Sequence, residues 1–292
     1  MNTKSILNFI LIVVRTIIAT FLAIVGFFLG AVIRDQIYNF FPNGNQILLG
    51  FAGLIVQILA ILLLLFIAAK IDGKSLKDYG IKWKENDGSN ILKGILLGAI
   101  LFSIACLPMY ILGYYELTTR TFSWTEIIVD LFGCIAVGVV EEYMFRGFIL
   151  HKLAFFGKIP AIIISGCIFA FAHLGNLGVS PVVIANIVLM GAFWAILMFI
   201  TDSIHLLVGF HFIWDFVEGS ILSIPFGDDK PYGILLTKLV NTNPFYTGGE
   251  FGLEGSIVLT PFLVVITIIA FVYAYKNGKL SKNPNSSLTL NN

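Results

Sequence analysis

Charged residues are scarce in this chain, where they make up 12% of the 292 residues, against about 25% in a typical soluble protein. Hydrophobic residues make up 58%, and the mean hydropathy is +0.94. This balance excludes an ordinary soluble domain and is typical of a protein that crosses a membrane several times. The net charge of +1 gives no sign of the clustered basic surface that nucleic acids require, so no nucleic-acid partner is expected.

Cysteines and metal-binding motifs are also few. The chain has three cysteines, Cys106, Cys134 and Cys167, which lie in apolar segments without CxxC spacing. We expect them to pack as small apolar side chains, which excludes a disulfide framework and a zinc finger. The HExxH motif that would argue strongly for zinc is absent from the sequence.

Long apolar runs are abundant. With about 20 residues for each crossing, the sequence predicts an all-α, polytopic membrane bundle of eight transmembrane helices. The first run is too long for the core of a signal peptide and is interrupted by Arg15, so we count it as a span. The predicted spans are Ile6 to Ile33, Ile47 to Ala69, Ile91 to Leu112, Trp124 to Ile149, Ile159 to Leu174, Pro181 to Ile200, Ile204 to Leu222 and Ile257 to Tyr275.

The distribution of Lys and Arg predicts the orientation. Eight spans place 13 basic residues on the side of the N-terminus and four on the other side, with Arg15 inside the first span. Short cytoplasmic loops are enriched in Lys and Arg, so both termini are expected in the cytoplasm. The 13 are Lys4, Lys70, Lys74, Lys77, Lys82, Lys84, Lys93, Arg146, Lys152, Lys158, Lys276, Lys279 and Lys282; the four are Arg34, Arg120, Lys230 and Lys238.

One domain is expected. Residues 1–276 are predicted to form a single transmembrane domain with a catalytic core at about 124–222. The connection from Ser223 to Gly255 shows no helical period and predicts an external loop. Residues 277–292, rich in Ser, Asn and Lys, predict a disordered cytoplasmic tail.

Ionisable residues within the apolar runs give the strongest indication of function. Glu141, Glu142 and Arg146 lie toward one end of the fourth span, and His173 lies in the fifth. Such groups are costly at membrane depth and usually line a water-filled or protein-lined cavity. The alternative is that the two acids lie at the interface and simply end the span.

The two adjacent acids have different expected roles. Glu142 and Arg146 are one helical turn apart, so they can pair, whereas Glu141 points about 100° away. A free carboxylate in an apolar cavity is suited to act as a general base. We therefore assign the catalytic role to Glu141 and the structural role to Glu142 with Arg146.

His173, His211 and Asp215 complete the candidate site. The midpoint between Glu141 and His173 is Gly157, in a segment with Gly and Pro where one helix should end and the next begin, so the two residues can lie at equal depth. A lone helical histidine is often only a hydrogen-bonded core residue. Asp215 lies one turn beyond His211 on the seventh span, and such a pair orients a histidine for catalysis or metal ligation.

These motifs resemble those of a known family. The EExxxR pattern at Glu141, Glu142 and Arg146, the FxxxH pattern at Phe169 and His173, and a third motif that begins at His211 occur in this order on separate predicted spans. The ordered set resembles the CAAX prenyl protease and bacteriocin-processing (CPBP, also called Abi) intramembrane proteases, over roughly Trp124 to Leu222.

The resemblance implies a membrane endopeptidase in which Glu141 and His173 activate a water molecule, while His211 and its partner stabilise the oxyanion. The third motif usually ends in Asn, whereas position 215 is Asp, and an ionised Asp has no hydrogen to donate. Asp215 is therefore either protonated or holds His211 as a charged donor, and we favour the second role. The resemblance implies membrane-associated peptides as substrates, such as prenylated C-terminal peptides, bacteriocin precursors or pheromone precursors. The abundance of Ile, Asn, Lys and Phe suggests a bacterial cell membrane, which argues against a prenylated substrate.

Two points stay open at this stage. No cofactor is favoured, but zinc is chemically acceptable, and its ligands would be Glu141, His173 and His211. The main functional alternative is a non-catalytic membrane protein that acts in bacteriocin self-immunity or as a scaffold. A transporter is a third alternative, because membrane-embedded acids and histidines also carry protons.

Overall fold

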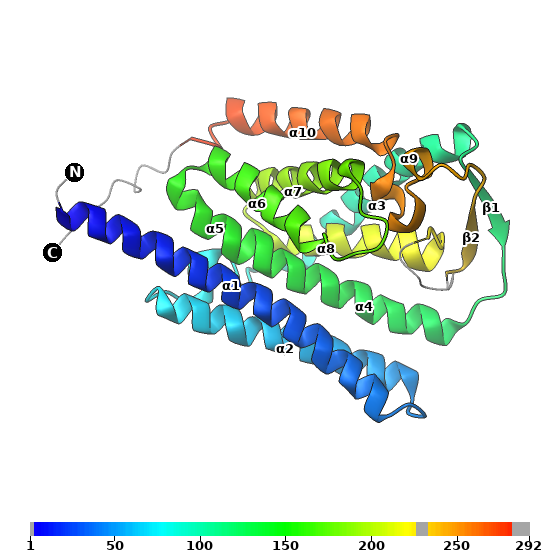
Figure 1. Ribbon diagram of the computed structural model, residues 1–292, viewed down its shortest axis with the longest axis horizontal. Coiled ribbons are helices and arrows are strands. Elements are labelled where there is room, and N and C mark those ends of the chain that lie inside the picture. Colours follow the sequence, from blue (N-terminus) through cyan, green and yellow to red (C-terminus); the bar gives the residue numbers. More distant parts are fainter. Residues whose placement is uncertain (1–2, 226–232, 282–292) are drawn as a thin grey trace.

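The computed structural model describes residues 3–225 and 233–281 of the chain, and it is a bundle of helices (Figure 1). The predicted disordered tail lies mostly outside the described residues, since the description ends at Ser281, and Leu280 is buried against the bundle. The predicted all-α membrane fold is confirmed in its class. A small two-stranded sheet is the addition that the sequence analysis did not include.

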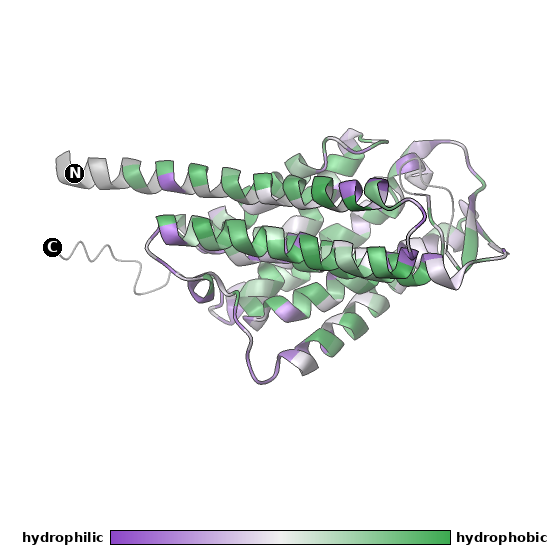
Figure 2. Ribbon diagram, turned by 90° about the horizontal axis from the view of Figure 1, so that it is seen from below, coloured by the Kyte–Doolittle hydropathy of each residue, from purple (hydrophilic) through white to green (hydrophobic). Residues whose placement is uncertain are grey.

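The first two helices form a hairpin on one side of the molecule. They are α1 (Thr3–Phe40) and α2 (Gln46–Ile71), and α2 begins where the Asn45 side chain accepts a hydrogen bond from the Leu48 N–H. The hairpin lies beside α4 (Trp124–Glu142) in Figure 1, and it packs on the rest of the bundle chiefly through contacts between α2 and α4. Its outer surface is apolar over most of its length, as Figure 2 shows, which suits contact with lipid.

Two helices lie inside the bundle. They are α7 (Pro181–Thr201) and α8 (Ile204–Phe216). In the apolar windows of the spans Pro181–Thr201 and Ile204–Ile221, 61% of the residues are buried, against 22% in that of Gln46–Ile71. Around them lie α3 (Asp87–Ile111), α6 (Lys158–Ala172) and α10 (Leu259–Lys276). The catalytic candidates on α8 are therefore in the interior.

Small residues allow α3 and α8 to come into backbone contact. A Cβ atom added at Gly94 would overlap the Leu206 carbonyl, and one at Gly209 would overlap the Ile91 carbonyl. Such close contacts between helices are typical of membrane bundles, where small residues let backbones approach. The position of α8, and of the site that it carries, depends on these glycines.

Five helices of the described residues are long and apolar enough to cross a membrane, so the chain is an integral, multi-pass membrane protein. They are Gln46–Ile71, Asp87–Ile111, Pro181–Thr201, Ile204–Ile221 and Leu259–Lys276. The three other predicted spans, which correspond to α1, α4 and α6, are not among the five. α4 carries four acidic residues, and α6 has only 15 residues. Eight spans and the orientation of the termini stay predictions.

The fourth predicted span is longer than an ordinary α-helix. α4 continues without a break into η2 (Tyr143–Ile149), a π-helical segment, then into α5 (Leu150–Leu153) and the 3₁₀ turn η3 (Ala154–Phe156). Gly157 then ends the chain of helices with a positive φ of 115°, and α6 begins at Lys158. The predicted break at Gly157 is confirmed.

The structure differs from the predicted irregular loop between Ser223 and Gly255. Strand β2 (Leu235–Leu239) pairs in antiparallel fashion with β1 (Tyr115–Thr119), and Tyr115 faces Leu239 in the register. Three short helices follow, α9 (Pro244–Thr247), η5 (Gly249–Phe251) and η6 (Leu253–Gly255). A further π-helical segment, η4 (Val217–Ile221), extends α8 toward them. The described part of this connection after the gap, residues 233–255, is thus a folded cap at one end of the bundle.

Candidate active site

A cavity of about 280 Å³ lies among α4, α6, α7, α8 and the cap. All four residues predicted to be catalytic line it: Glu141, His173, His211 and Asp215. The structure therefore brings together side chains from three helical segments that are far apart in the sequence. Glu142 and Arg146, predicted to have supporting roles, are not part of the lining.

Glu142 and Arg146 form a buried ion pair behind the cavity. The Arg146 Nη1 donates to Glu142 Oε1 at 3.0 Å, and the two side chains are 2% and 0% exposed. The same oxygen accepts a second hydrogen bond from His211 Nδ1 at 2.9 Å. Glu142 thus links α4 to α8 and fixes the orientation of the His211 ring.

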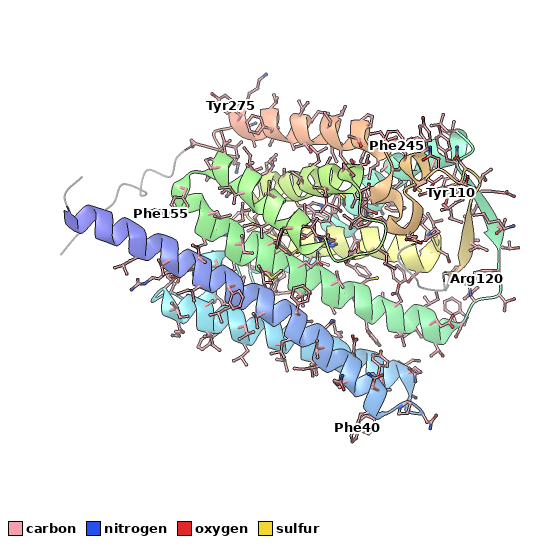
Figure 3. All side chains as sticks on the ribbon, in the orientation of Figure 1. Phe40, Tyr110, Arg120, Phe155, Phe245 and Tyr275 are labelled. Atoms are coloured by element: carbon pink, nitrogen blue, oxygen red, sulfur yellow. The ribbon has the colours of Figure 1, made fainter. Side chains whose placement is uncertain are left out.

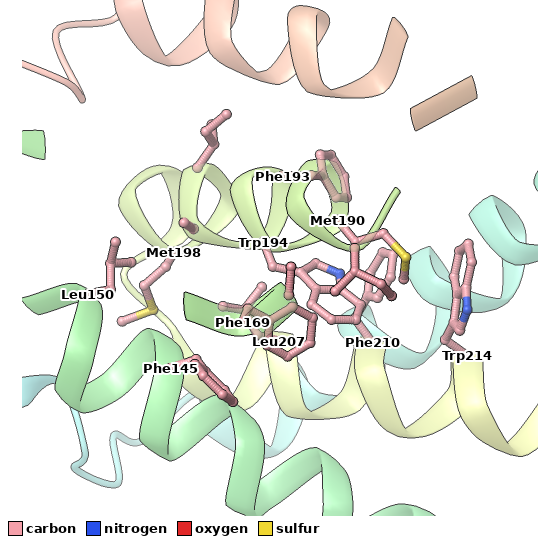
Figure 4. Close-up of a cluster of buried hydrophobic side chains, with 14 of the residues drawn as sticks. Phe145, Leu150, Phe169, Met190, Phe193, Trp194, Met198, Leu207, Phe210 and Trp214 are labelled. Carbon is pink, nitrogen blue, oxygen red and sulfur yellow. The ribbon is translucent and has the colours of Figure 1, made fainter. Parts of the chain in front are cut away.

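Aromatic rings hold the Arg146 guanidinium from the other sides. Its Cζ lies 4.2 Å from the centre of the Phe169 ring and 4.8 Å from that of Trp194. Figure 4 shows these rings in one buried cluster, in which Trp194 lies between Phe169 and Phe210. A guanidinium between ring faces is favoured electrostatically, and Arg suits such stacking better than Lys. The Phe of the FxxxH motif therefore supports the Arg of the EExxxR motif.

Glu141 faces the cavity and has a different environment from its neighbour. It is 6% exposed, and its Oε2 accepts no hydrogen bond from the described residues. The Nε2 of His211 lies 3.8 Å from this oxygen, which is too long for a hydrogen bond. Glu141 is the acid of the pair that is left without a fixed partner.

His173 lies at the end of α6, where it forms the C-cap. Its Nδ1 lies 2.8 Å from the Phe169 carbonyl oxygen. A carbonyl oxygen can only accept, so Nδ1 carries the hydrogen and Nε2 is the nitrogen with a free lone pair in the neutral ring. The Phe169 carbonyl therefore selects the tautomer that can accept a proton at Nε2.

His211 lies among three carboxylates. In addition to Glu142 at Nδ1, its Nε2 is 3.5 Å from Asp215 Oδ2 and 3.8 Å from Glu141 Oε2. The His211 ring also lies against Trp194, with the ring centres 4.5 Å apart. In this position a doubly protonated ring would have an anion on each side.

Two further buried acids line the cavity, and the sequence analysis did not identify them. Glu218 accepts a hydrogen bond from the Leu253 N–H at 2.9 Å, and Glu254 accepts one from Trp214 Nε1 at 2.5 Å. The two acids tie the cap to the extended α8. Glu218 follows His211 by seven residues on the same helical face, so its periodicity was a usable signal. No pattern in the sequence pointed to Glu254, because it lies in the cap.

The residues named as zinc ligands, Glu141, His173 and His211, all line the cavity. Among the described residues, no group of three or more His, Cys, Asp or Glu side chains stands out as a metal site. Metal dependence stays a prediction. No step proposed below runs through a metal.

The fold and the cavity together define a class: a multi-pass membrane protein with four acids and two histidines around one cavity. Residues 122–217 match the protein-family model described as type II CAAX prenyl endopeptidase, Rce1-like. The resemblance to CPBP-family intramembrane proteases is thereby confirmed, and it implies a protease of the CAAX-endopeptidase kind. The match covers about a third of the chain and includes every predicted site residue, but not Glu218 or Glu254. No curated protein and no solved structure matches the chain significantly.

Proposed function

We propose that the chain is an intramembrane endopeptidase in which Glu141 and His173 activate a water molecule for attack on a peptide carbonyl. The observation that carries this proposal is the cavity of about 280 Å³, where a carboxylate without a fixed partner and two histidines meet. A buried acid of this kind is suited to general-base catalysis. In this proposal the His173 Nε2, which has no hydrogen in the neutral ring, accepts a hydrogen bond from the same water.

The reaction balances with the groups in the cavity. Glu141 takes one proton from the water, the water oxygen bonds to the carbonyl carbon, and the C=O π electron pair moves to the carbonyl oxygen. The C=O bond then re-forms as the C–N bond breaks, and the proton held by Glu141 passes to the leaving nitrogen. The products are a peptide with a new carboxyl end and a peptide with a new amino end.

His211 is the donor to the oxyanion in this proposal. The ring is oriented by Glu142 at Nδ1, and Asp215, 3.5 Å from Nε2, favours its charged form. Donors that are fixed before the reaction stabilise developing negative charge most effectively. Asp215 in place of the family's usual Asn then acts through His211 and does not itself contact the oxyanion.

The substrate in this proposal is a peptide associated with the membrane, and bacteriocin or similar precursors are the expected class. We also propose eight crossings with both termini in the cytoplasm, and a bacterial cell membrane as the location. The distribution of Lys and Arg supports the orientation. The chemistry is proposed to be independent of metal.

The test compares the membrane peptides of cells that carry the native protein, Glu141→Gln, or the control Glu126→Gln. Glu126 lies on the same helix, α4, but is exposed. Loss of a general base lowers turnover by about 10²–10⁴-fold, so precursors should accumulate with Glu141→Gln and not with Glu126→Gln. Normal processing by folded Glu141→Gln protein would reject the assignment. An unchanged peptide profile when the whole protein is removed would favour the non-catalytic alternative.

A further inference from the structure

A second cavity, of about 220 Å³, lies at the end of the bundle that holds the end of α2 and the segment α5–η3. Four basic residues line it: Arg15 from α1, Lys74 from the segment after α2, and His151 and Lys152 from α5. Of these, Arg15, Lys74 and Lys152 are the cations. We call this cavity the basic pocket. None of its residues belongs to the candidate active site.

One carboxylate is present in the basic pocket, and it already has two partners. Asp72 accepts a hydrogen bond from the Tyr79 hydroxyl at 2.5 Å and forms an ion pair with Lys152. No ion pair joins Arg15 or Lys74 to an acidic side chain in the part of the chain that the structure describes. Lys74 Nζ lies 5.4 Å from the centre of the Tyr79 ring. The pocket therefore keeps two positive charges that no carboxylate neutralises.

The electrostatics of Lys152 agree with this excess of positive charge. Burial lowers the pKa of the Lys152 ammonium, and Asp72 acts in the opposite direction. Lys74 and Arg15 lower that pKa further by repulsion. An anion bound in the pocket would offset this repulsion among the three cations.

The position of Arg15 along α1 points to a lipid headgroup as the source of the anion. Arg15 is 25 residues from the end of α1 at Phe40, which is about 38 Å of helix. The hydrocarbon core of a bilayer is about 30 Å thick, and about 40–45 Å with the headgroups. Arg15 also shares the pocket with Asp72 and Lys74, which directly follow α2, so it lies level with the end of that neighbouring span, although the predicted first span includes it.

Apolar surface adjoins the basic side chains on the lipid-facing side. Leu11 and Ile18 on α1 are both more than 40% exposed, and they flank Arg15 at spacings of four and three residues. Phe155, labelled in Figure 3 near α1, lines the pocket and is 41% exposed. This surface suits acyl chains, which a free phosphate ion would not need.

We propose that the basic pocket binds the phosphate of an anionic phospholipid, with Arg15 and Lys74 as the main ligands of the headgroup. Basic pockets between transmembrane helices are suited to such headgroups. The pocket also gives a reason for an arginine in the middle of an otherwise apolar run. The inference is independent of the proposed peptidase activity.

The experiment measures lipid binding to the purified full-length protein by native mass spectrometry. Phosphatidylglycerol is the anionic probe, phosphatidylcholine the neutral lipid and inorganic phosphate the lipid-free anion. Each basic residue near a membrane surface contributes about fivefold to the affinity for anionic lipid. The variant Arg15→Gln/Lys74→Gln should therefore bind phosphatidylglycerol about 30-fold more weakly, while binding to phosphatidylcholine stays low in both proteins.

The matched control is Lys77→Gln/Lys82→Gln, which removes two exposed lysines from the same loop region outside the pocket. It should change the affinity for phosphatidylglycerol by less than about threefold, since these charges do not line the pocket. Arg15→Lys/Lys74→Arg keeps both charges and should bind phosphatidylglycerol as tightly as the native protein does. This variant tests the proposal even where the glutamine variant does not fold. Equal losses in the control, equal binding of both lipids, or equal affinity for inorganic phosphate would each overturn the proposal.

Discussion

Glu141 and Glu142 are neighbours in the chain, but replacement by glutamine should affect mainly activity at Glu141 and mainly stability at Glu142. Glu142 accepts hydrogen bonds from Arg146 and His211 and is fully buried, whereas Glu141 Oε2 accepts none. We predict that Glu142→Gln destabilises the fold strongly. Glu141→Gln should leave the fold nearly unchanged and abolish cleavage.

The magnitude for Glu142→Gln follows from the charge that it leaves behind. The guanidinium of Arg146 would stay buried without a counter-charge, and breaking a buried pair in this way costs about 3–5 kcal/mol. For a protein of this size the change corresponds to a decrease in Tm of roughly 10 °C. Glu141→Gln loses only a 3.8 Å approach to His211, so the expected cost is below about 1 kcal/mol.

The assay is thermal unfolding of the detergent-solubilised variants, together with cleavage of a peptide substrate. A double-mutant cycle adds Arg146→Gln and the combined Glu142→Gln/Arg146→Gln protein. Because the combined variant has no unpaired buried charge, the cycle should give a coupling energy of about 2–3 kcal/mol. The reasoning is refuted if Glu141→Gln lowers Tm as much as Glu142→Gln does, or if the coupling energy is near zero.

Three further outcomes are expected. Asp215→Asn should lower turnover in a peptide-cleavage assay roughly tenfold, because His211 loses a charged partner. A higher turnover than that of the native protein would contradict this role. Stringent chelation of the purified protein should leave its cleavage rate unchanged, and restoration by zinc of a rate lost on chelation would show metal dependence. Gly94→Ala should destabilise the fold by about 3 kcal/mol in thermal unfolding, because its Cβ overlaps the Leu206 carbonyl. Gly88→Ala, which meets open space on the same helix, is the control and should be neutral or slightly stabilising.

The helical class and the grouping of the site residues were accessible from the sequence, because each depends on helical periodicity. The pairing of Glu142 with Arg146 follows from their spacing of four residues, and the break at Gly157 follows from the Gly and Pro in that segment. The distance from this break to Glu141 and to His173 then indicated that both reach the same depth.

Other features depend on contacts that no local pattern encodes. The pairing of Tyr115–Thr119 with Leu235–Leu239 joins short segments about 120 residues apart, and neither has a strong strand pattern. Glu254 reaches the cavity only because the cap folds back over α8. The hydrogen bond from His211 to Glu142 likewise depends on how closely α4 and α8 pack, which spacing alone does not determine.

The π-helical segment η2 affects how the helix between the two cavities responds to the loss of a residue. The N–H of Leu150 bonds to the Phe145 carbonyl, five residues back, so this turn contains one residue more than an α-turn. Deletion of a single residue there would therefore restore an α-turn and keep the helix beyond it in nearly its present orientation. Deletion of one residue from a regular α-helical turn would instead rotate everything beyond it by about 100°. The π-helical turn is thus the part of this helix where the loss of one residue should be least damaging.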